Sequence, residues 1–284
     1  MSVTYKYTSG LDHTIRQLVE FNNVAFQGYL VDFSFSPEGF ESFFVPQHGV
    51  HGLSVYMHTS DGEFAGFSRT ALRGTRAWVA GLAIVPEFRG KGTGKKLMTE
   101  YLRVLRESGR VKTVTLEVLK ENPVATRLYE SVGFKLTSTV HKLQFDGKMD
   151  APDNDGSINI AEGIDATLPW LHYKIAYMWQ REWCVISMKE NARTVRYVNK
   201  DGETVTSLIV FHDESKNMLV VQACAFTKDT TAKDLQAIFA YYCNEKAVTR
   251  IILPYEPVDS PAMPLFQEIG FFEDDMEYIM QIDL

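Results

Sequence analysis

A strand that runs into a glycine-rich loop and then a helix constrains this chain more than any other stretch. The apolar run Val79–Val85 predicts a strand, and the loop Arg89–Gly94 (RGKGTG) follows it. Glycines let a backbone approach a phosphate closely, and the first N–H groups of a helix have no intrahelical partner. The helix dipole and the side chains of Lys91, Lys95 and Lys96 add positive charge. The pattern therefore predicts a phosphate site. The helix itself is predicted from apolar residues at helical spacing: Leu97, Met98, Tyr101, Leu102 and Leu105.

The spacing of this loop excludes two common phosphate-binding motifs. Counted back from Gly94-Lys95, a Walker loop needs a glycine where Arg89 stands and a hydroxyl where Lys96 stands. A dinucleotide fingerprint needs its third glycine where Lys95 stands. The remaining pattern, R-x-x-G-x-G at a strand-to-helix junction, resembles the pyrophosphate loop of the GNAT family of coenzyme A–dependent N-acetyltransferases.

A second signature of the same family follows downstream. Thr113–Val118 predicts a buried strand, and Asn122–Phe134 then resembles the family pattern N-x-x-A-x-x-L-Y-x-x-x-G-F. An ordinary strand–helix–strand unit with a glycine turn would rarely carry both signatures in this order. The resemblance implies an α/β (α+β) fold with a mixed, mostly antiparallel sheet flanked by helices.

Length and composition limit the remaining possibilities. The chain has 284 residues, enough for two domains, and 45% hydrophobic residues, enough for a sizeable core. A net charge of -7 without a long basic run argues against nucleic acid as a partner. The three cysteines are far apart and odd in number, which favours a reducing compartment. We expect a cytoplasmic protein, a monomer or a homodimer, without a signal peptide or a membrane partner.

The first half predicts a domain with helices over an antiparallel sheet. Ser2–Tyr7 predicts a first strand, and Asp12 is the expected cap of the next helix. Phe21–Phe44 is rich in aromatic residues and predicts two short helices and a loop, either as a lid over the acceptor site or as plain packing. The strands expected next are Leu53–His58, Glu63–Arg73, Ala77–Val85 and, after the second signature, Lys135–Phe145.

The second half repeats this pattern. Leu265–Phe271 is a near copy of Leu128–Phe134, and Asp165–Gln180 predicts a helix. We infer two tandem GNAT-like domains, with a catalytic domain at 1–147, a polar linker at 148–156 and a degenerate domain at 157–284. Further elements are expected at Thr194–Val198, Glu203–Phe211, Met218–Phe226, Ala232–Cys243 and Val248–Leu253.

The second domain lacks the chemistry of the first. Thr227–Ala232 stands in place of the glycine loop and carries an acidic residue, which would repel pyrophosphate. Asp259 and Phe266 stand where the first half has Asn122 and Tyr129. We therefore expect this domain to be structural or to shape the acceptor pocket, and a ligand site of its own stays open.

The resemblance implies acetyl transfer from acetyl-CoA, as co-substrate, to a primary amine of a small molecule or a peptide by direct attack. It implies Tyr129 as the acid that protonates the departing thiolate. A tyrosine at helical spacing could also be a core residue. The residues implied to bind the cofactor are Leu82, Ala83, Ile84, Arg89, Gly90, Lys91, Gly92, Thr93, Gly94, Lys95 and Asn122.

Some features leave the function open. Glu117, Glu87, His48 and His51 are candidates for the general base, and none is assigned. His48 and His51 have no third ligand placed near them in sequence, so no metal site is predicted. Two alternatives to the acetyltransferase remain. One is a regulatory module that binds acyl-CoA without turnover, and the other is an enzyme that transfers a different acyl group.

Overall fold

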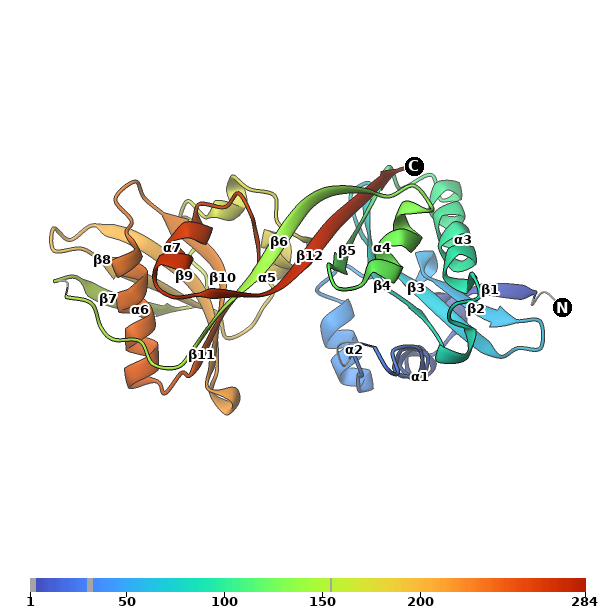
Figure 1. Cartoon of the computed structure of the whole chain (residues 1–284), viewed down its shortest axis with the longest axis horizontal. Helices are drawn as coiled ribbons and strands as arrows, with labels where there is room; N and C mark the ends of the chain where they lie inside the picture. Colours follow the sequence, from blue (N-terminus) through green and yellow to red (C-terminus); the bar gives the residue numbers. More distant parts are fainter. Residues whose placement is uncertain (1–3, 30–32, 154) are drawn as a thin grey trace. The chain divides into compact units, whose positions relative to one another are not determined.

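The computed structural model describes residues 4–29, 33–153 and 155–284, and the chain divides into two compact units (Figure 1). The first unit comprises Met1–Thr137 together with Ile279–Leu284, and the second comprises Ser138–Tyr278. The predicted linker, 148–156, lies within the second unit. Residues 2–3 of the predicted first strand, 30–32 of the aromatic segment and 154 of the linker lie outside the described residues.

The first unit contains a mixed sheet with the strand order β1-β2-β3-β4-β5, and the end of β12 lies beside β5. Pairing is antiparallel from β1 to β4, whereas β4 and β5 run parallel. A parallel pair needs a crossover, which α3 provides. In Figure 1, α1 and α2 lie on one side of this sheet and α3 and α4 on the other. The strands are β1 (Tyr5–Ser9), β2 (Val55–Thr59), β3 (Phe64–Arg73), β4 (Arg76–Ile84) and β5 (Thr113–Leu119), and the helices are α1 (Ile15–Ala25), α2 (Pro37–Phe44), α3 (Thr93–Glu107) and α4 (Pro123–Glu130).

The second unit contains a similar sheet with the order β6-β11-β10-β9-β8-β7. β10 and β11 run parallel, with α6 between them in sequence, and the other pairs are antiparallel. The predicted mixed sheet flanked by helices is therefore confirmed. The strands are β6 (Lys135–Asp146), β7 (Ser157–Glu162), β8 (Arg193–Val198), β9 (Thr204–Asp213), β10 (Met218–Phe226), β11 (Arg250–Pro257) and β12 (Phe272–Asp283), and the helices are α5 (Trp183–Ile186), α6 (Ala232–Glu245) and α7 (Ala262–Glu268).

The sequence repeat corresponds to the same turn in both units. α4 and α7 are each followed by a glycine with positive φ, 105° at Gly133 and 90° at Gly270. The next N–H group then returns to the helix, from Phe134 to the Tyr129 carbonyl and from Phe271 to the Phe266 carbonyl, both at 3.1 Å. Glycine at these two positions ends the helix and starts the following strand without backbone strain.

The cap of α1 differs from the prediction. Thr14, not Asp12, is the N-cap residue, and its hydroxyl accepts from the Gln17 N–H at 3.3 Å. Asp12 instead closes the preceding 3-10 turn, where its carboxylate accepts from the Ser9 N–H at 2.7 Å. Both residue types cap helices, so the sequence offered two candidates two positions apart.

The helix predicted over Asp165–Gln180 is wrong, because this segment is a loop. Proline has no N–H and restricts the preceding residue to extended conformations, so Pro169 prevents a helix from passing Leu168. The aromatic spacing that suggested a helix reflects burial of single side chains. The loop contains two 3-10 turns, Leu171–Tyr173 and Trp179–Arg181.

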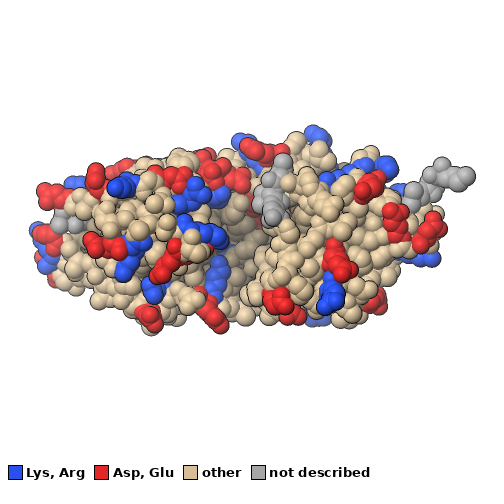
Figure 2. Space-filling model, turned by 90° about the horizontal axis from the view of Figure 1, so that it is seen from below, with Lys and Arg blue, Asp and Glu red and all other residues tan. Residues whose placement is uncertain are grey.

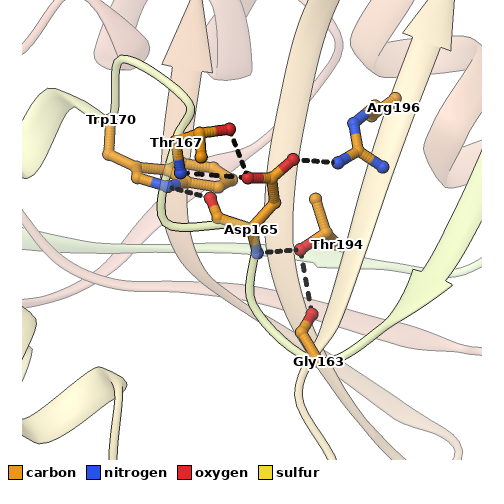
Figure 3. A network of polar contacts seen from close by, with 6 residues as sticks. All are labelled: Gly163, Asp165, Thr167, Trp170, Thr194 and Arg196. Carbon is orange, nitrogen blue, oxygen red and sulfur yellow. Dashed lines mark hydrogen bonds and ion pairs between the residues drawn. The ribbon is translucent and has the colours of Figure 1, made fainter.

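Asp165 fixes the start of this loop (Figure 3). Its Oδ1 accepts from the Thr167 N–H at 2.9 Å, and its carbonyl accepts from the Trp170 indole N–H at 2.9 Å. The Asp165 N–H donates to Thr194 Oγ1 at 3.0 Å, and its carboxylate pairs with Arg196. These bonds satisfy the backbone locally and compete with helix formation. Trp170 is fully buried as a result.

Charged side chains are spread over the surface, and the helices are short or polar. On the face shown in Figure 2, acidic and basic side chains are interspersed over each unit. Within the described part of the chain, every helix is too short or too polar to cross a membrane.

Candidate functional site

A cavity of about 540 Å³ lies within the first unit, between the end of β4 and the starts of α3 and α4. The turn that follows α1 closes a further side. All the residues predicted to bind the cofactor line this cavity except Lys91, namely Leu82, Ala83, Ile84, Arg89, Gly90, Gly92, Thr93, Gly94, Lys95 and Asn122. Two predicted stretches far apart in sequence are thus brought together.

The cavity exists because β4 and β5 diverge. The two strands pair at Arg76–Trp78 with Thr113–Thr115, and among the residues that the structure describes no strand pairs with the end of β4 on that side. Leu82, Ala83 and Ile84 line the cavity, and the antiparallel pairing directs the backbone groups of Leu82 and Ile84 away from β3. Unpaired strand groups of this kind are a template for an extended ligand that pairs as an added strand.

A register shift between β3 and β4 follows the point of divergence, and it contains Gly81, a glycine that the sequence analysis does not name. Gly81 has φ of 139° and lies against the guanidinium of Arg69. A Cβ at residue 81 would lie 2.7 Å from Arg69 Nη2, so the guanidinium would have to move, and the φ of Gly81 disfavours any side chain. Arg69 is 3% exposed and donates from Nη1 to Asn22 Oδ1 at 2.8 Å, and burial lowers its pKa to about 10.

The glycine loop opens α3 as predicted. Gly92 is the N-cap residue of α3 with φ of 74°, and Gly90 has the same φ. Gly92 has no side chain to cap the helix, so the first N–H groups of α3 stay available to an external acceptor. A negatively charged ligand is favoured there by both the free N–H groups and the helix dipole.

Two basic side chains of the loop donate to the protein's own backbone. Arg89 donates from Nε to the Ile84 carbonyl at 2.9 Å, and from Nη2 to the carbonyls of Ala25 at 2.9 Å and Gln27 at 2.8 Å. Lys91 donates from Nζ to the Glu87 carbonyl at 2.8 Å. This contact directs Lys91 away from the cavity.

Asn122 lies at the opposite wall, and its side chain takes part in two hydrogen bonds. Its Oδ1 caps α4 by accepting from the Ala125 N–H at 3.1 Å, and its Nδ2 donates to the Tyr29 hydroxyl at 3.3 Å. Tyr29 lines the cavity, as does Phe26, whose ring centroid lies 5.4 Å from that of Tyr29. The sequence indicated Tyr29 only as one member of the aromatic segment.

Tyr129 is 7% exposed and lies in α4 next to Leu128, and unlike Leu128 it is not among the residues that line the cavity. Its ring packs against Phe134, with centroids 5.9 Å apart. Burial raises the pKa of the Tyr129 phenol well above its ordinary value of 10, and the nearby Tyr29 phenol raises it further. The hydroxyl therefore keeps its proton over the whole neutral range.

The candidate bases lie outside the lining of the cavity. The Glu117 carboxylate accepts from the Trp78 indole N–H, and Glu87 is exposed. His48 Nδ1 accepts from Arg73 Nε at 3.2 Å. His51 packs on Phe44, and burial followed by the charge of Arg69 lowers its pKa. Among the described residues, no group of three histidine, cysteine or acidic side chains is arranged to hold a metal ion.

The corresponding place in the second unit is filled by its own side chains. β10 and β11 pair in parallel only at Met218–Val220 with Arg250–Ile252. Beyond that point Arg181 bridges the two strands, donating to the Gln222 carbonyl of β10 at 2.9 Å and to the Glu256 carboxylate of β11 at 2.5 Å. Glu256 is fully buried and also accepts from the Tyr177 hydroxyl at 2.8 Å.

The turn before α6 is likewise closed. The N–H of Thr227 donates to Thr230 Oγ1 at 2.9 Å, and the N–H of Thr231 donates to Asp234 Oδ2 at 2.7 Å. These side chains occupy N–H groups of the kind that the glycine loop leaves open in the first unit. The negative charge of the carboxylate at the start of this helix would also repel a phosphate.

Comparison with known proteins identifies relatives of the first unit. The sequence model of the acetyltransferase (GNAT) family matches residues 16–134. The ribosomal protein bS18-alanine N-acetyltransferase of Escherichia coli K12 is 31% identical over 114 residues, which cover 39% of this chain and 75% of that protein. The spermine/spermidine N(1)-acetyltransferase of Bacillus subtilis 168 is 29% identical over 96 residues, covering 31% and 61%.

Solved structures resemble the fold of the whole chain. A GCN5-related N-acetyltransferase from Sphaerobacter thermophilus superposes with a TM-score of 0.67 at 15% identity, covering 98% of this chain and 95% of that one. A tandem GNAT protein from the clavulanic acid biosynthesis pathway gives a TM-score of 0.65 at 13% identity, with coverage of 99% and 98%. These likenesses confirm the predicted tandem fold.

Proposed function

The chain belongs to the GNAT family of acetyltransferases, and on that premise we propose that its first unit transfers the acetyl group of acetyl-CoA to a primary amine by direct attack. The observation that carries this proposal is the cavity at the β4–β5 divergence, which has an uncapped helix start at one end. A long ligand with a pyrophosphate and an extended amide arm fits both features.

The pyrophosphate would lie on the loop, held by backbone N–H groups from Gly90 to Lys95. The pantetheine arm would pair with the free edge of β4 at Ile84. The Leu82 N–H would then donate to the thioester carbonyl. A donor aimed at the oxygen that becomes negative in the tetrahedral intermediate contributes about 3 kcal/mol to catalysis.

In the proposed reaction, the amine nitrogen attacks the thioester carbonyl carbon, and the C–S bond breaks as the tetrahedral intermediate collapses. The leaving thiolate takes the proton of the Tyr129 phenol, and the phenolate is reprotonated from solvent. The nitrogen loses its extra proton, so the products are an acetamide and free coenzyme A. We assign no side chain as general base. Asn122 would contact the pantetheine arm.

The acceptor is proposed as a class. One relative is named for an alanine of ribosomal protein bS18 and another for spermine and spermidine, so the acceptor is proposed to be an amine of a peptide or of a small molecule. The acyl group is proposed to be acetyl. A cytoplasmic location is part of the proposal and agrees with the three cysteines, which are all free thiols.

Calorimetry and thiol release together test the proposal. We expect coenzyme A and acetyl-CoA to bind with one site per chain, because Arg181 and Glu256 fill the second unit's equivalent place. Acetyl-CoA with spermidine, and separately with a peptide beginning in alanine, should release thiol faster than acetyl-CoA alone. Binding without thiol release across a broad amine panel would support the regulatory module. Absence of binding would remove both functions.

A further inference from the structure

Arg89 contacts the end of α1, although it belongs to the glycine loop. Its guanidinium donates to the carbonyls of Ala25 and Gln27, which lie 64 and 62 positions earlier in the chain. Ala25 is the last residue of α1, where carbonyl groups have no intrahelical partner. A cation there is also favoured by the helix dipole. Arg89 therefore fastens the C-terminus of α1 to the loop.

The turn held by Arg89 carries Tyr29. Gly28 takes a left-handed conformation with φ of 68°, and the Tyr29 N–H donates to the Phe26 carbonyl at 3.0 Å. This turn places Phe26 and Tyr29 in the cavity lining. The Tyr29 hydroxyl then meets Asn122 Nδ2 at 3.3 Å, on the opposite wall.

These contacts form a continuous chain around the cavity. It runs from the loop through Arg89 to the turn 25–29, and from Tyr29 to Asn122 at the start of α4. Arg89 also donates to the Ile84 carbonyl at the end of β4. The planar guanidinium can bond several carbonyls at fixed angles, which a lysine ammonium cannot reproduce. A conformational change in the glycine loop can therefore alter the position of Tyr29 through the side chain of Arg89.

We propose that Arg89 is a positioning residue that couples the glycine loop to the turn 25–29, so that a coenzyme A bound to the loop orders Tyr29 against Asn122. This inference rests on the proposed function, because it takes coenzyme A as the ligand of the loop. Gly90 and Gly92 have no side chain to restrict the backbone of the loop. A ligand that fixes the loop also fixes Arg89, and it thereby stabilises the contact between Tyr29 and Asn122 that this structure shows.

Hydrogen exchange with the full-length protein tests this coupling, with coenzyme A as the probe. In the wild-type protein, coenzyme A should slow amide exchange of peptides covering Val24–Tyr29 at least fivefold. Arg89→Lys keeps the positive charge, but its ammonium cannot donate to all the carbonyls that the guanidinium reaches. At a coenzyme A concentration that saturates the variant, it should lose most of the added protection. A purely structural role of Arg89 would lower protection equally with and without the ligand.

Arg106→Lys is the matched control, because Arg106 is exposed in the last turn of α3 and outside the cavity lining. It should behave as wild type. Full protection in Arg89→Lys, or equal losses with and without coenzyme A, would overturn the proposal. Failure of coenzyme A to saturate Arg89→Lys at any attainable concentration would also overturn it, by making Arg89 a phosphate ligand. If the wild-type protein bound no coenzyme A, the proposed function itself would fail.

Discussion

At the scale of single residues, Tyr129 shows how burial sets the chemistry of a side chain. Its phenol lies in the core of the first unit, where the charged form is unfavourable. A packing role alone would be preserved by phenylalanine, which has the same ring without the hydroxyl. An acid role would not.

We therefore expect Tyr129→Phe to lower turnover tenfold or more while the Kd for acetyl-CoA stays within about threefold, since a general acid acts in the transition state. Steady-state thiol release and calorimetry measure the two quantities. Leu128, its neighbour, lines the cavity and should not be the control. Phe134→Leu perturbs the packing of the same ring without touching the hydroxyl and should leave turnover closer to wild type. Unchanged turnover in Tyr129→Phe would remove Tyr129 from the mechanism.

The raised pKa of Tyr129 also predicts a pH profile. An acid works only while protonated, and a pKa above the ordinary value of 10 keeps the proton in place up to that pH. Turnover at saturating substrates should therefore show no decline from about pH 7 to about pH 10, because Tyr129 does not ionise there. A falling limb with a midpoint below about pH 9, with the fold intact by circular dichroism, would contradict this assignment.

At the scale of elements, the start of α3 depends on backbone conformations that only glycine adopts without strain. Gly92 has φ of 74° at the N-cap. Gly109, just beyond the other end of α3, has φ of 65° and similarly open surroundings. A side chain would cause similar backbone strain at either glycine, but only Gly92 of the two lines the cavity.

Gly92→Ala should weaken coenzyme A binding at least tenfold and destabilise the fold by roughly 1–2 kcal/mol, the cost of a side chain in a left-handed conformation. Gly109→Ala should cost a similar amount of stability and leave the Kd unchanged. Denaturant unfolding and calorimetry separate the two effects. Equal affinities for both variants would show that the loop does not hold the ligand.

At the scale of the whole molecule, the last residues of the chain complete the first unit. Ile279–Leu284 belong to this unit, and the Leu284 N–H donates to the Lys112 carbonyl beside the start of β5. The Ile282 side chain packs against Gly133. A boundary drawn after residue 147 therefore separates the first unit from one of its own strands.

A fragment of residues 1–147 should aggregate or unfold at a lower temperature than the full chain, because it leaves the edge of β5 unpaired. Gel filtration and thermal unfolding followed by circular dichroism test this. The matched comparison is the same fragment with residues 279–284 joined to its C-terminus by a flexible linker, which should recover part of the loss. A monodisperse 1–147 fragment that binds coenzyme A as the full chain does would refute the expectation.

The sequence alone determined the features that depend on neighbouring residues. The glycine loop, the apolar face of α3, the two signatures and the repeated glycine turns are local patterns, and each is present in the structure. Pro169 is an equally local signal, because it keeps Leu168 out of a helical conformation. This signal contradicts the helix wrongly predicted over Asp165–Gln180.

Only the tertiary structure determined which residues far apart in the sequence contact one another. The contacts of Arg89 with Ala25, of Asn122 with Tyr29 and of Arg181 with Glu256 join residues 64, 93 and 75 positions apart. No spacing rule predicts such pairs, because strand order and helix packing bring them together. The physical reason is that secondary structure follows from backbone sterics and periodicity over a few residues, whereas partners in space follow from how whole elements bury their apolar faces.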